Sequence, residues 1–338
     1  MNGSNWFVLQ QLNLWLSQGI QPWLATVIET YGSSPRPVGS MMLYHPDKGI
    51  IGSLSGGCIE QELMNQLADG DLSIESIFPK IIRYGESAEQ RSRLALPCGG
   101  HLDILLEKID PSDQLHFNQI EKALDSRQWI SRHIRLDFES ELETGTAHQQ
   151  GIGITTEISE YDVKRNLDIQ RKPNEIIHTL KPHDKLLLIG AGEVSRCLAE
   201  ICKHLEFDIT LCDFRGEFLQ GWHVDGVQVI KAMPDDVIAD AFHDNHCAIV
   251  ALAHDPRVDD MAMMQALKTE AFYVGAMGSL ITSNKRRERL LELDLSQTQI
   301  EKLHAPIGIN IHSRTPYEIA VSIAAQLIEQ RSHRQIAP

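Results

Sequence analysis

The sequence predicts an α/β protein with a C-terminal Rossmann-like, doubly wound parallel sheet and an N-terminal mixed α+β domain. Two observations predict the C-terminal sheet. From residue 185 onward, short apolar segments alternate with helical segments, a pattern typical of parallel strands that are buried on both faces. The first of these strands leads into a glycine turn, Gly190-Ala-Gly192, that opens a helix. In addition, a chain of 338 residues is long enough for two domains.

We expect an N-terminal domain over residues 1–163, a linker over 164–184 and the Rossmann-like domain over 185–338. The linker interpretation depends on a polar stretch, RKPNEIIHTLKPHDK, which prolines interrupt twice. The pattern of expected elements changes after this stretch. Before it, helices and strands are mixed, and after it, strands and helices alternate regularly.

The composition excludes some classes of protein. A net charge of −15 argues against a nucleic-acid surface, and 42% apolar with 23% charged residues is typical of a globular protein. The sequence has no apolar run of membrane-spanning length and no export signal. The six cysteines form no tight framework, so we expect reduced thiols in a cytoplasmic protein. Four of them are expected to be small buried side chains: Cys197, Cys202, Cys212 and Cys247.

Apolar spacing and turn residues predict the elements of each half. In the first half they predict a helix that ends at Gly19, strands over 23–30, 40–45 and 48–54, a helix over 59–69, a strand within 96–109, a helix over 115–127 and weaker strands over 129–156. In the second half they predict strands over 185–190, 207–213, 227–230, 247–254 and 271–278, with helices over 191–205 and 235–242.

The glycine turn of the second half begins a dinucleotide fingerprint. Gly190 makes the turn, Gly192 lets a phosphate approach the helix N-terminus, and Ser195 takes the third glycine position. Asp213 follows Gly192 by 21 residues, where a ribose-binding carboxylate belongs. These residues indicate a nucleotide such as NAD(P) or, alternatively, a turn retained only for packing.

Other polar residues are expected at the same edge of this sheet. His254 and Asp255 follow the fourth strand and are candidates for proton transfer, but Asp255 is also a candidate cap for the helix that begins near Pro256. A basic helix face is either solvated or a site for an anion. It consists of Lys285, Arg286, Arg287 and Arg289.

Two cysteines of the first half each lie beside a pair of glycines. The two segments are Gly56-Gly57-Cys58 and Cys98-Gly99-Gly100. Glycine pairs let a ligand approach the backbone closely. If the two loops converge, they present two thiols to one open site, and a thiolate is a ligand for soft metals or a nucleophile. His101 adds a third ligand for zinc, but no fourth ligand is evident.

Segments spread in order over nearly the whole chain resemble the xanthine dehydrogenase accessory protein family, also called the XdhC/CoxI family. The segments of the first half are GSSPRPVGSMML, GSLSGGCIE and CGGHLDILLE. Those of the second half are LLLIGAGEVSRCLAEICKHL, HDPRVDD, YVGAMGS and PIGINIHSRTPYEIAVSIAAQLI.

The resemblance implies a chaperone that binds the molybdenum cofactor, a molybdopterin, and delivers its sulfurated form to apo-xanthine dehydrogenase in purine catabolism. It also implies a cysteine desulfurase as a second partner, and an accessory protein rather than a turnover enzyme. On this basis Cys58 and Cys98 would contact the molybdenum or pass sulfur to it. The glycine pairs and Arg36 would bind the pterin phosphate. Glu60 would bond pterin nitrogens or, alternatively, cap its helix.

The second half departs from the family pattern at Glu193, Ser195, Leu280 and His312.

The main alternative function is an NAD(P)-dependent oxidoreductase that uses the glycine turn and Asp213, with His254 as its acid–base. A third is a nucleotide-sensing module that controls the first half. A homodimer is plausible, because exposed strands of a small first domain would gain from pairing.

Overall fold

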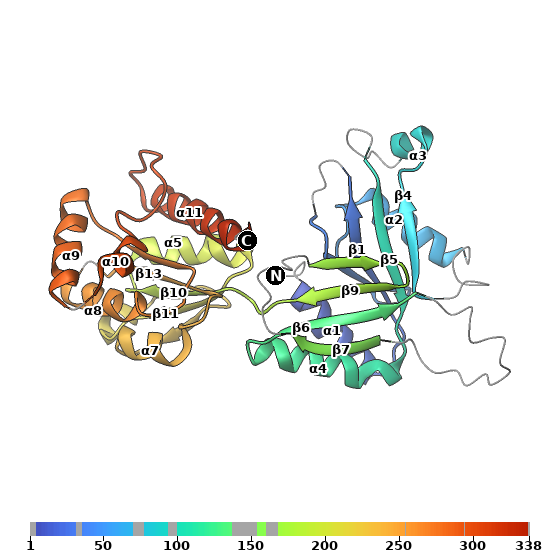
Figure 1. Cartoon of the computed structure of the whole chain (residues 1–338), viewed down its shortest axis with the longest axis horizontal. Helices are drawn as coiled ribbons and strands as arrows, with labels where there is room; N and C mark the ends of the chain where they lie inside the picture. Colours follow the sequence, from blue (N-terminus) through green and yellow to red (C-terminus); the bar gives the residue numbers. More distant parts are fainter. Residues whose placement is uncertain are drawn as a thin grey trace. The chain divides into compact units, whose positions relative to one another are not determined.

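The computed structural model describes residues 5–31, 36–69, 78–93, 100–136, 154–159, 168–253, 255–293 and 295–336. The chain divides into two compact units, Met1–Pro182 and His183–Pro338. Figure 1 shows the first unit in blue to green and the second in yellow to red. Among the described residues, no helix combines the length and the apolar character that a membrane span requires.

The first unit contains two antiparallel sheets. The larger sheet has the strand order β3-β2-β1-β5-β4, and the smaller one has the order β7-β6-β9-β8. The strands are β1 (Trp23–Thr30), β2 (Met41–His45), β3 (Gly49–Gly52), β4 (Lys80–Tyr84), β5 (Leu102–Lys108), β6 (Trp129–Arg135), β7 (Ile154–Ser159), β8 (Ile169–Lys172) and β9 (Glu175–Leu180). The α-helices are α1 (Asn5–Ser17), α2 (Cys58–Ala68), α3 (Ala88–Arg93) and α4 (Gln114–Asp125), and a short 3₁₀ helix, η2 (Pro111–Asp113), precedes α4.

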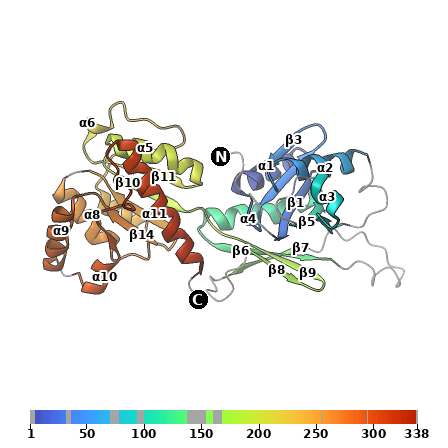
Figure 2. The same ribbon diagram turned by 90° about the horizontal axis from the view of Figure 1, so that it is seen from above.

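Each face of the five-stranded sheet is covered by different elements, because alternate residues of a strand point to opposite faces. Leu24 packs in a core with side chains of α1 and α4, which lie side by side in Figure 2. Its neighbour Ala25 packs in a second core with Ile59 and Leu63 of α2. On the first face, Leu105 also packs against isoleucines of the four-stranded sheet.

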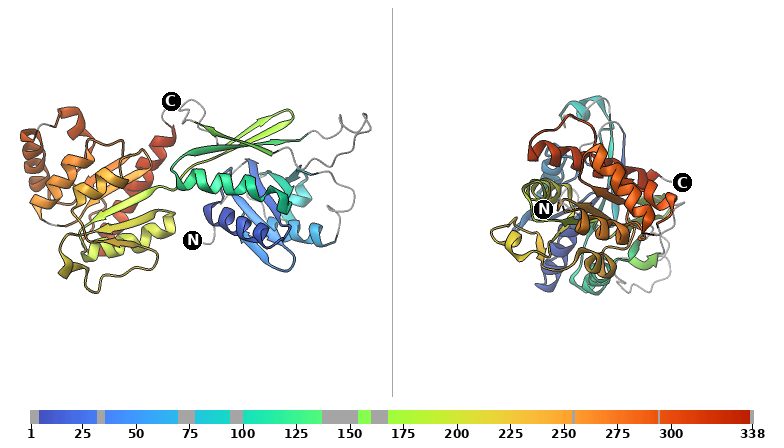
Figure 3. Two further views of the ribbon diagram at one scale, coloured as in Figure 1. Left: turned by 90° about the horizontal axis from the view of Figure 1, so that it is seen from below. Right: turned by 90° about the vertical axis from the view of Figure 1, so that its left-hand side faces the viewer.

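Two carboxylates of β5 bind arginines of the four-stranded sheet. Arg132 Nη2 lies 2.7 Å from Glu107 Oε1, and both side chains are fully buried. Arg171 Nη1 lies 3.0 Å from Asp103 Oδ2. Removing one partner of a buried pair leaves an uncompensated charge, which typically costs about 3–5 kcal/mol. Ion pairs as well as apolar packing therefore join the two sheets. Figure 3 shows both sheets in the first unit.

The second unit contains six parallel strands in the order β12-β11-β10-β13-β14-β15. This is the Rossmann order 3-2-1-4-5-6, and the sheet is parallel and doubly wound, as the sequence predicts. The strands are β10 (Lys185–Ile189), β11 (Asp208–Cys212), β12 (Gln228–Ile230), β13 (Cys247–Ala251), β14 (Tyr273–Ala276) and β15 (Leu303–His304). The helices are α5 (Glu193–Cys202), η5 (Lys203–Leu205), α6 (Gly216–Leu219), α7 (Pro234–Ala241), α8 (Pro256–Ala266), α9 (Leu280–Glu292), α10 (Gln297–Glu301) and α11 (Pro316–Ile336). Helices α5 and α11 cover one face of the sheet, whereas α7 and α8 cover the other (Figure 1).

The expected linker over 164–184 is wrong for the residues that form β8 and β9. These two strands pair antiparallel, with Lys172 opposite Glu175. Pro173 lies in the tight turn between them, where proline interrupts no ladder hydrogen bond. The described chain passes between the units at Pro182 and His183. The strand β4 is absent from the sequence prediction.

The two glycines of the turn after β10 differ in their surroundings, which predicts different costs for alanine. A Cβ on Gly190 would lie 2.5 Å from Ala253 Cα, and Gly190 has a φ of +103°, which L-residues avoid. We expect Gly190→Ala to lower the free energy of unfolding of this unit by about 2–4 kcal/mol. A Cβ on Gly192 would meet no atom within 4 Å. Gly192→Ala is therefore the matched control, with an expected cost below about 1 kcal/mol.

Urea unfolding of both variants, followed by circular dichroism, measures this difference. Equal midpoints for the two variants would contradict the packing role of Gly190.

Candidate functional site

Four segments of the first unit meet at one end of the five-stranded sheet. Thr30, the last residue of β1, lies opposite Leu102, the first residue of β5. Leu102 also lies opposite Tyr84, the last residue of β4. On the other side, Gly52 at the end of β3 lies opposite Met42 near the start of β2. The segments that follow β1, β3 and β4 and the segment that precedes β5 therefore all lie at this end.

The structure describes most of the residues that are predicted to bind the molybdenum cofactor. All of the described ones lie in these segments or at the start of α2, which follows β3. Arg36 is partly exposed in the segment between β1 and β2, and Gly100 is buried just before β5. Gly56, Gly57 and Cys58 are exposed between β3 and α2. Cys98 and Gly99 lie outside the described residues, so their predicted place beside Cys58 stays a prediction.

The carboxylate of Glu60 organises the segment between β3 and α2. Its two oxygens accept six hydrogen bonds from this segment, four from backbone N–H groups and two from serine hydroxyls. At Oε1 the donors are Ser53 Oγ (2.7 Å), Leu54 N (2.9 Å), Ser55 N (2.8 Å) and Gly56 N (2.9 Å), and at Oε2 they are Ser55 Oγ (2.7 Å) and Gly57 N (2.8 Å). The four consecutive N–H groups form a concave nest of the kind that binds anions.

The charge of Glu60 is stabilised by these donors. The side chain is buried, and burial alone would raise the pKa of its carboxyl group. The backbone N–H groups of Gly56 and Ser55 and the hydroxyls of Ser55 and Ser53 outweigh burial, so the pKa lies well below its ordinary value. Glu60 is therefore ionised at neutral pH.

This geometry corrects two expectations about the loop. The predicted phosphate cradle is wrong for the N–H groups of Gly56 and Gly57, because both donate to Glu60. Of the two roles expected for Glu60, the structure shows the capping role, since the N–H group of Gly57, the N-cap of α2, donates to it. A carboxylate with six donors has no capacity left for pterin nitrogens.

The glycines of this loop are required by its conformation. Gly56 and Gly57 have φ values of +104° and +151°, which residues with a Cβ rarely adopt. A Cβ on Gly52 would lie 2.3 Å from Met41 O. The result is that Cys58 begins α2 with an exposed thiol, directly after two residues without side chains. An exposed thiol on a rigid loop is accessible to a soft metal or to a sulfur donor.

Cys58 belongs to no metal-binding cluster of three or more side chains in the described ranges. There, no three His, Cys, Asp or Glu side chains are grouped so that they could hold a metal ion. The other four described cysteines are buried, as predicted: Cys197, Cys202, Cys212 and Cys247.

In the second unit, Asp213 is saturated by its own chain. Its carboxylate accepts bonds from the N–H group of Ala191 at 2.9 Å, from the N–H group of Arg215 at 3.0 Å and from the Arg215 guanidinium at 2.9 Å to each oxygen. Burial would raise its pKa, but these donors hold the pKa below the ordinary value. The expected ribose contact therefore competes with bonds that already join the loops after β10 and β11.

The glycine turn itself keeps an open approach to α5. No atom lies near the position of a Cβ on Gly192, which is the N-cap of the helix. Ser195 is fully buried, and its hydroxyl donates to the carbonyl of Gly192 at 2.7 Å. Serine in the third glycine position is thus accommodated by a local hydrogen bond.

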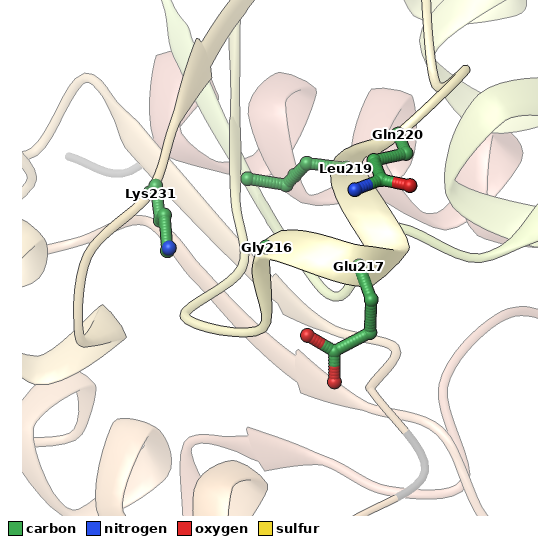
Figure 4. A pocket seen from close by; sticks show the side chains of 5 residues that line it. All are labelled: Gly216, Glu217, Leu219, Gln220 and Lys231. Carbon is green, nitrogen blue, oxygen red and sulfur yellow. The ribbon is translucent and has the colours of Figure 1, made fainter.

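A hollow of about 560 Å³ lies near the ends of β11 and β12 (Figure 4). Its lining residues are Gly216, Glu217, Leu219, Gln220 and Lys231. A Cβ on Gly216 would lie 2.9 Å from Lys231 Nζ, so the glycine makes room for the ammonium group. Glu217 and Lys231 carry opposite charges, so the lining favours neither anions nor cations.

The remaining polar candidates of the second unit have structural partners. Asp255 caps α8, since it accepts from the N–H group of Arg257 at 3.0 Å, whereas His254 lies outside the described residues. Arg286 is buried and binds Asp259 at 3.2 Å and Asp260 at 2.8 Å.

Two further arginines of α9 also have partners within the unit. Arg289 binds Asp260 at 2.6 Å, and Arg287 donates to the carbonyl of Ala305 at 2.6 Å. The expected solvated or anion-binding face on α9 is therefore wrong for Arg286, which is buried, whereas Arg287 and Arg289 have partners but stay partly exposed.

Comparison with known sequences identifies the family. Residues 186–327 match the profile of the XdhC Rossmann domain, and residues 15–73 match that of the XdhC and CoxI family. The two segments together cover more than half of the chain. The chain belongs to the XdhC and CoxI family. The second match includes the whole Glu60 loop and Cys58.

Relatives within the family span nearly the whole chain. The chain is 25% identical to a protein of Bacillus subtilis named as a probable xanthine dehydrogenase component, over 91% of this chain and 92% of the relative. It is 23% identical to the "Molybdenum cofactor insertion chaperone PaoD" of Escherichia coli, over 92% and 84% of the two chains. A crystal structure described as a xanthine dehydrogenase from Bacillus halodurans superposes with a TM-score of 0.73 at 24% identity, over 96% of both chains. This superposition shows that the two proteins share a fold.

The six donors on Glu60 predict a large effect of its removal. We expect Glu60→Ala to lower the free energy of unfolding of the first unit by about 2–4 kcal/mol, because several buried donors lose their acceptor. Gln61→Ala is the matched control, since Gln61 is exposed on the next position of α2. Chemical denaturation of both variants measures the difference, and equal stabilities would contradict the organising role of the carboxylate.

The lowered pKa of Glu60 also predicts a pH dependence. A group whose pKa is lower in the folded state stabilises the fold above its unfolded pKa, here an ordinary value of 4.5, and this stabilisation is lost as the pH falls toward the folded pKa. We expect the wild-type protein to lose more stability than Glu60→Gln between pH 5 and about pH 3. Parallel pH dependences of the melting temperature in the two proteins would contradict this assignment.

Proposed function

We propose that this chain binds the molybdenum cofactor and inserts it into an apo-enzyme of the xanthine dehydrogenase type. Family membership supports the proposal, as do two relatives whose names refer to xanthine dehydrogenase and to cofactor insertion. The observation that carries it is the exposed thiol of Cys58 on a loop that Glu60 holds rigid. A carrier needs such a ligand, because the cofactor must be bound and then released.

Different residues of the first unit contact different parts of the cofactor in this proposal. Cys58 contacts the molybdenum or passes sulfur to it, and Cys98 is the second thiol of the proposed site. Arg36 pairs with the phosphate of the cofactor, since a guanidinium binds phosphate oxygens in a bidentate manner. Gly99 allows the ligand to approach the backbone, whereas Gly100 is buried and holds the start of β5 in place. The molybdenum carries out redox chemistry in the client enzyme, and this chain holds and transfers the cofactor.

The alternative function, an NAD(P)-dependent oxidoreductase, has less support. Both oxygens of Asp213 already accept bonds from Ala191 and Arg215, whereas a ribose diol needs a free acceptor. The open N-terminus of α5 at Gly192 remains compatible with a regulatory nucleotide. Neither a nucleotide such as NAD(P) nor a nucleotide-sensing role is needed for the proposed carrier function.

The proposal also includes partners. The client is an apo-molybdoenzyme of the xanthine dehydrogenase type, and a cysteine desulfurase supplies the sulfur of the sulfurated cofactor. We further propose a cytoplasmic location and a homodimer. Size-exclusion chromatography with light scattering tests the homodimer independently of cofactor binding.

Cofactor retention tests the function directly. The wild-type protein is incubated with molybdenum cofactor and desalted, and molybdenum and oxidised-pterin fluorescence are measured. We expect stoichiometric retention by the wild-type protein and at least a tenfold loss in Cys58→Ser and in Cys58→Ser/Cys98→Ser, because a hydroxyl is a poor ligand for a soft metal. Gln61→Ala should retain as much as the wild type. Failure of the wild-type protein to retain cofactor would refute the carrier function, and full retention by the double variant would remove the thiols from it.

A further inference from the structure

An exposed aromatic pair lies at the loop end of the five-stranded sheet. The rings of Tyr31 and His101 are stacked, with an interplanar angle of 2° and centroids 5.6 Å apart. The side chain of Tyr31 is 67% exposed. Since one face of its ring lies against His101, most of the exposed area belongs to the other face and the edge of the ring.

The pair is fixed by the strands and not only by its own stacking. Tyr31 directly follows β1, and its N–H group donates to the carbonyl of His101 at 3.0 Å. Thr30, which precedes Tyr31, is the last residue of β1. It pairs in the sheet with Leu102, the first residue of β5, which follows His101. The tyrosine ring is therefore presented at a defined place, which lowers the entropy cost of binding a flat ligand to it.

The position of the pair relates it to the Cys58 loop. Both lie at the same end of the sheet, since β1 and β3 end there. Only β2 separates these two strands, which are about 10 Å apart across the sheet at two interstrand spacings, and Gly52 is level with Ala25, so β1 extends five residues beyond the end of β3. His101 directly follows Gly100, a residue of the proposed site. The aromatic pair therefore lies beside the Gly100 segment of the proposed site, at the end of the sheet where the Cys58 loop begins.

We propose that Tyr31, supported by His101, is a stacking platform for the planar pterin ring of the cofactor. The inference rests on the proposed carrier function and adds a binding residue to it. The conjugated pyrimidinone ring of a pterin stacks on tyrosine without needing specific hydrogen bonds. Tyr31 then holds the ring of the ligand while a thiol of the proposed site holds its metal end, and both contacts are open enough to be released.

Substitution of Tyr31 tests the platform. Tyr31→Leu removes the aromatic face but keeps an apolar side chain, whereas Tyr31→Phe keeps the face. Because stacking of a base on an aromatic side chain corresponds to about a 5- to 150-fold change in affinity, we expect a loss of that size for Tyr31→Leu and little change for Tyr31→Phe. The control is Tyr317→Leu, which removes a tyrosine that is 49% exposed in α11 of the second unit.

Two ligands are titrated into each variant, the molybdenum cofactor and neopterin, a pterin without metal or phosphate. A selective loss of both in Tyr31→Leu supports the platform. If the wild-type protein fails to retain the cofactor but neopterin binding still depends on Tyr31, the platform stands and the carrier function fails. Equal binding of both ligands by Tyr31→Leu and the wild type overturns the platform alone. Unchanged binding with weaker activation of the apo-enzyme overturns it in favour of a docking role for Tyr31.

Discussion

The carboxylate of Glu60 is the contact on which the proposed site depends. Six donors from a single loop converge on it, and they include four consecutive backbone N–H groups. A loop with this many polar groups and two glycines at positive φ would otherwise be loosely held. The internal anion gives the loop one conformation, and that conformation leaves Cys58 exposed at the start of α2. The same anion occupies the nest, so the N–H groups of the glycines are not available to a phosphate.

The two units use glycine for different purposes, although both present a glycine-rich turn before a helix. In the first unit, the positive φ angles of the two glycines in the SGGC segment let the backbone N–H groups point at the buried carboxylate of Glu60. In the second unit, Gly190 is needed because Ala253 passes close to it, whereas nothing crowds Gly192. Asp213 resembles Glu60 in that its oxygens are bonded within the chain. The open approach at Gly192 therefore remains as a feature of the second unit that packing does not explain.

Much of the fold can be predicted from local patterns. The Rossmann-like parallel sheet follows from alternating apolar strands and helices and from the glycine turn, which are signals within short windows. β8 and β9 cannot be found this way, because Pro173 suggests a break although it occupies the turn of a hairpin. The sequence predicts only part of the role of Glu60. Its place three residues after Gly57 indicates a helix cap. The convergence of four backbone N–H groups on its carboxylate depends on φ angles, which cannot be read from a sequence. The ring contact of Tyr31 with His101 arises from strand pairing across 70 positions and has no local signal.

Hydrogen–deuterium exchange with and without the molybdenum cofactor tests the carrier function most directly, because it locates the ligand without any substitution. We predict slower exchange in peptides that cover residues 31–41 and 53–61, with no change over residues 190–196. Slower exchange confined to residues 190–196 and 213–217 would place the cofactor in the Rossmann unit and contradict a site built on the Glu60 loop.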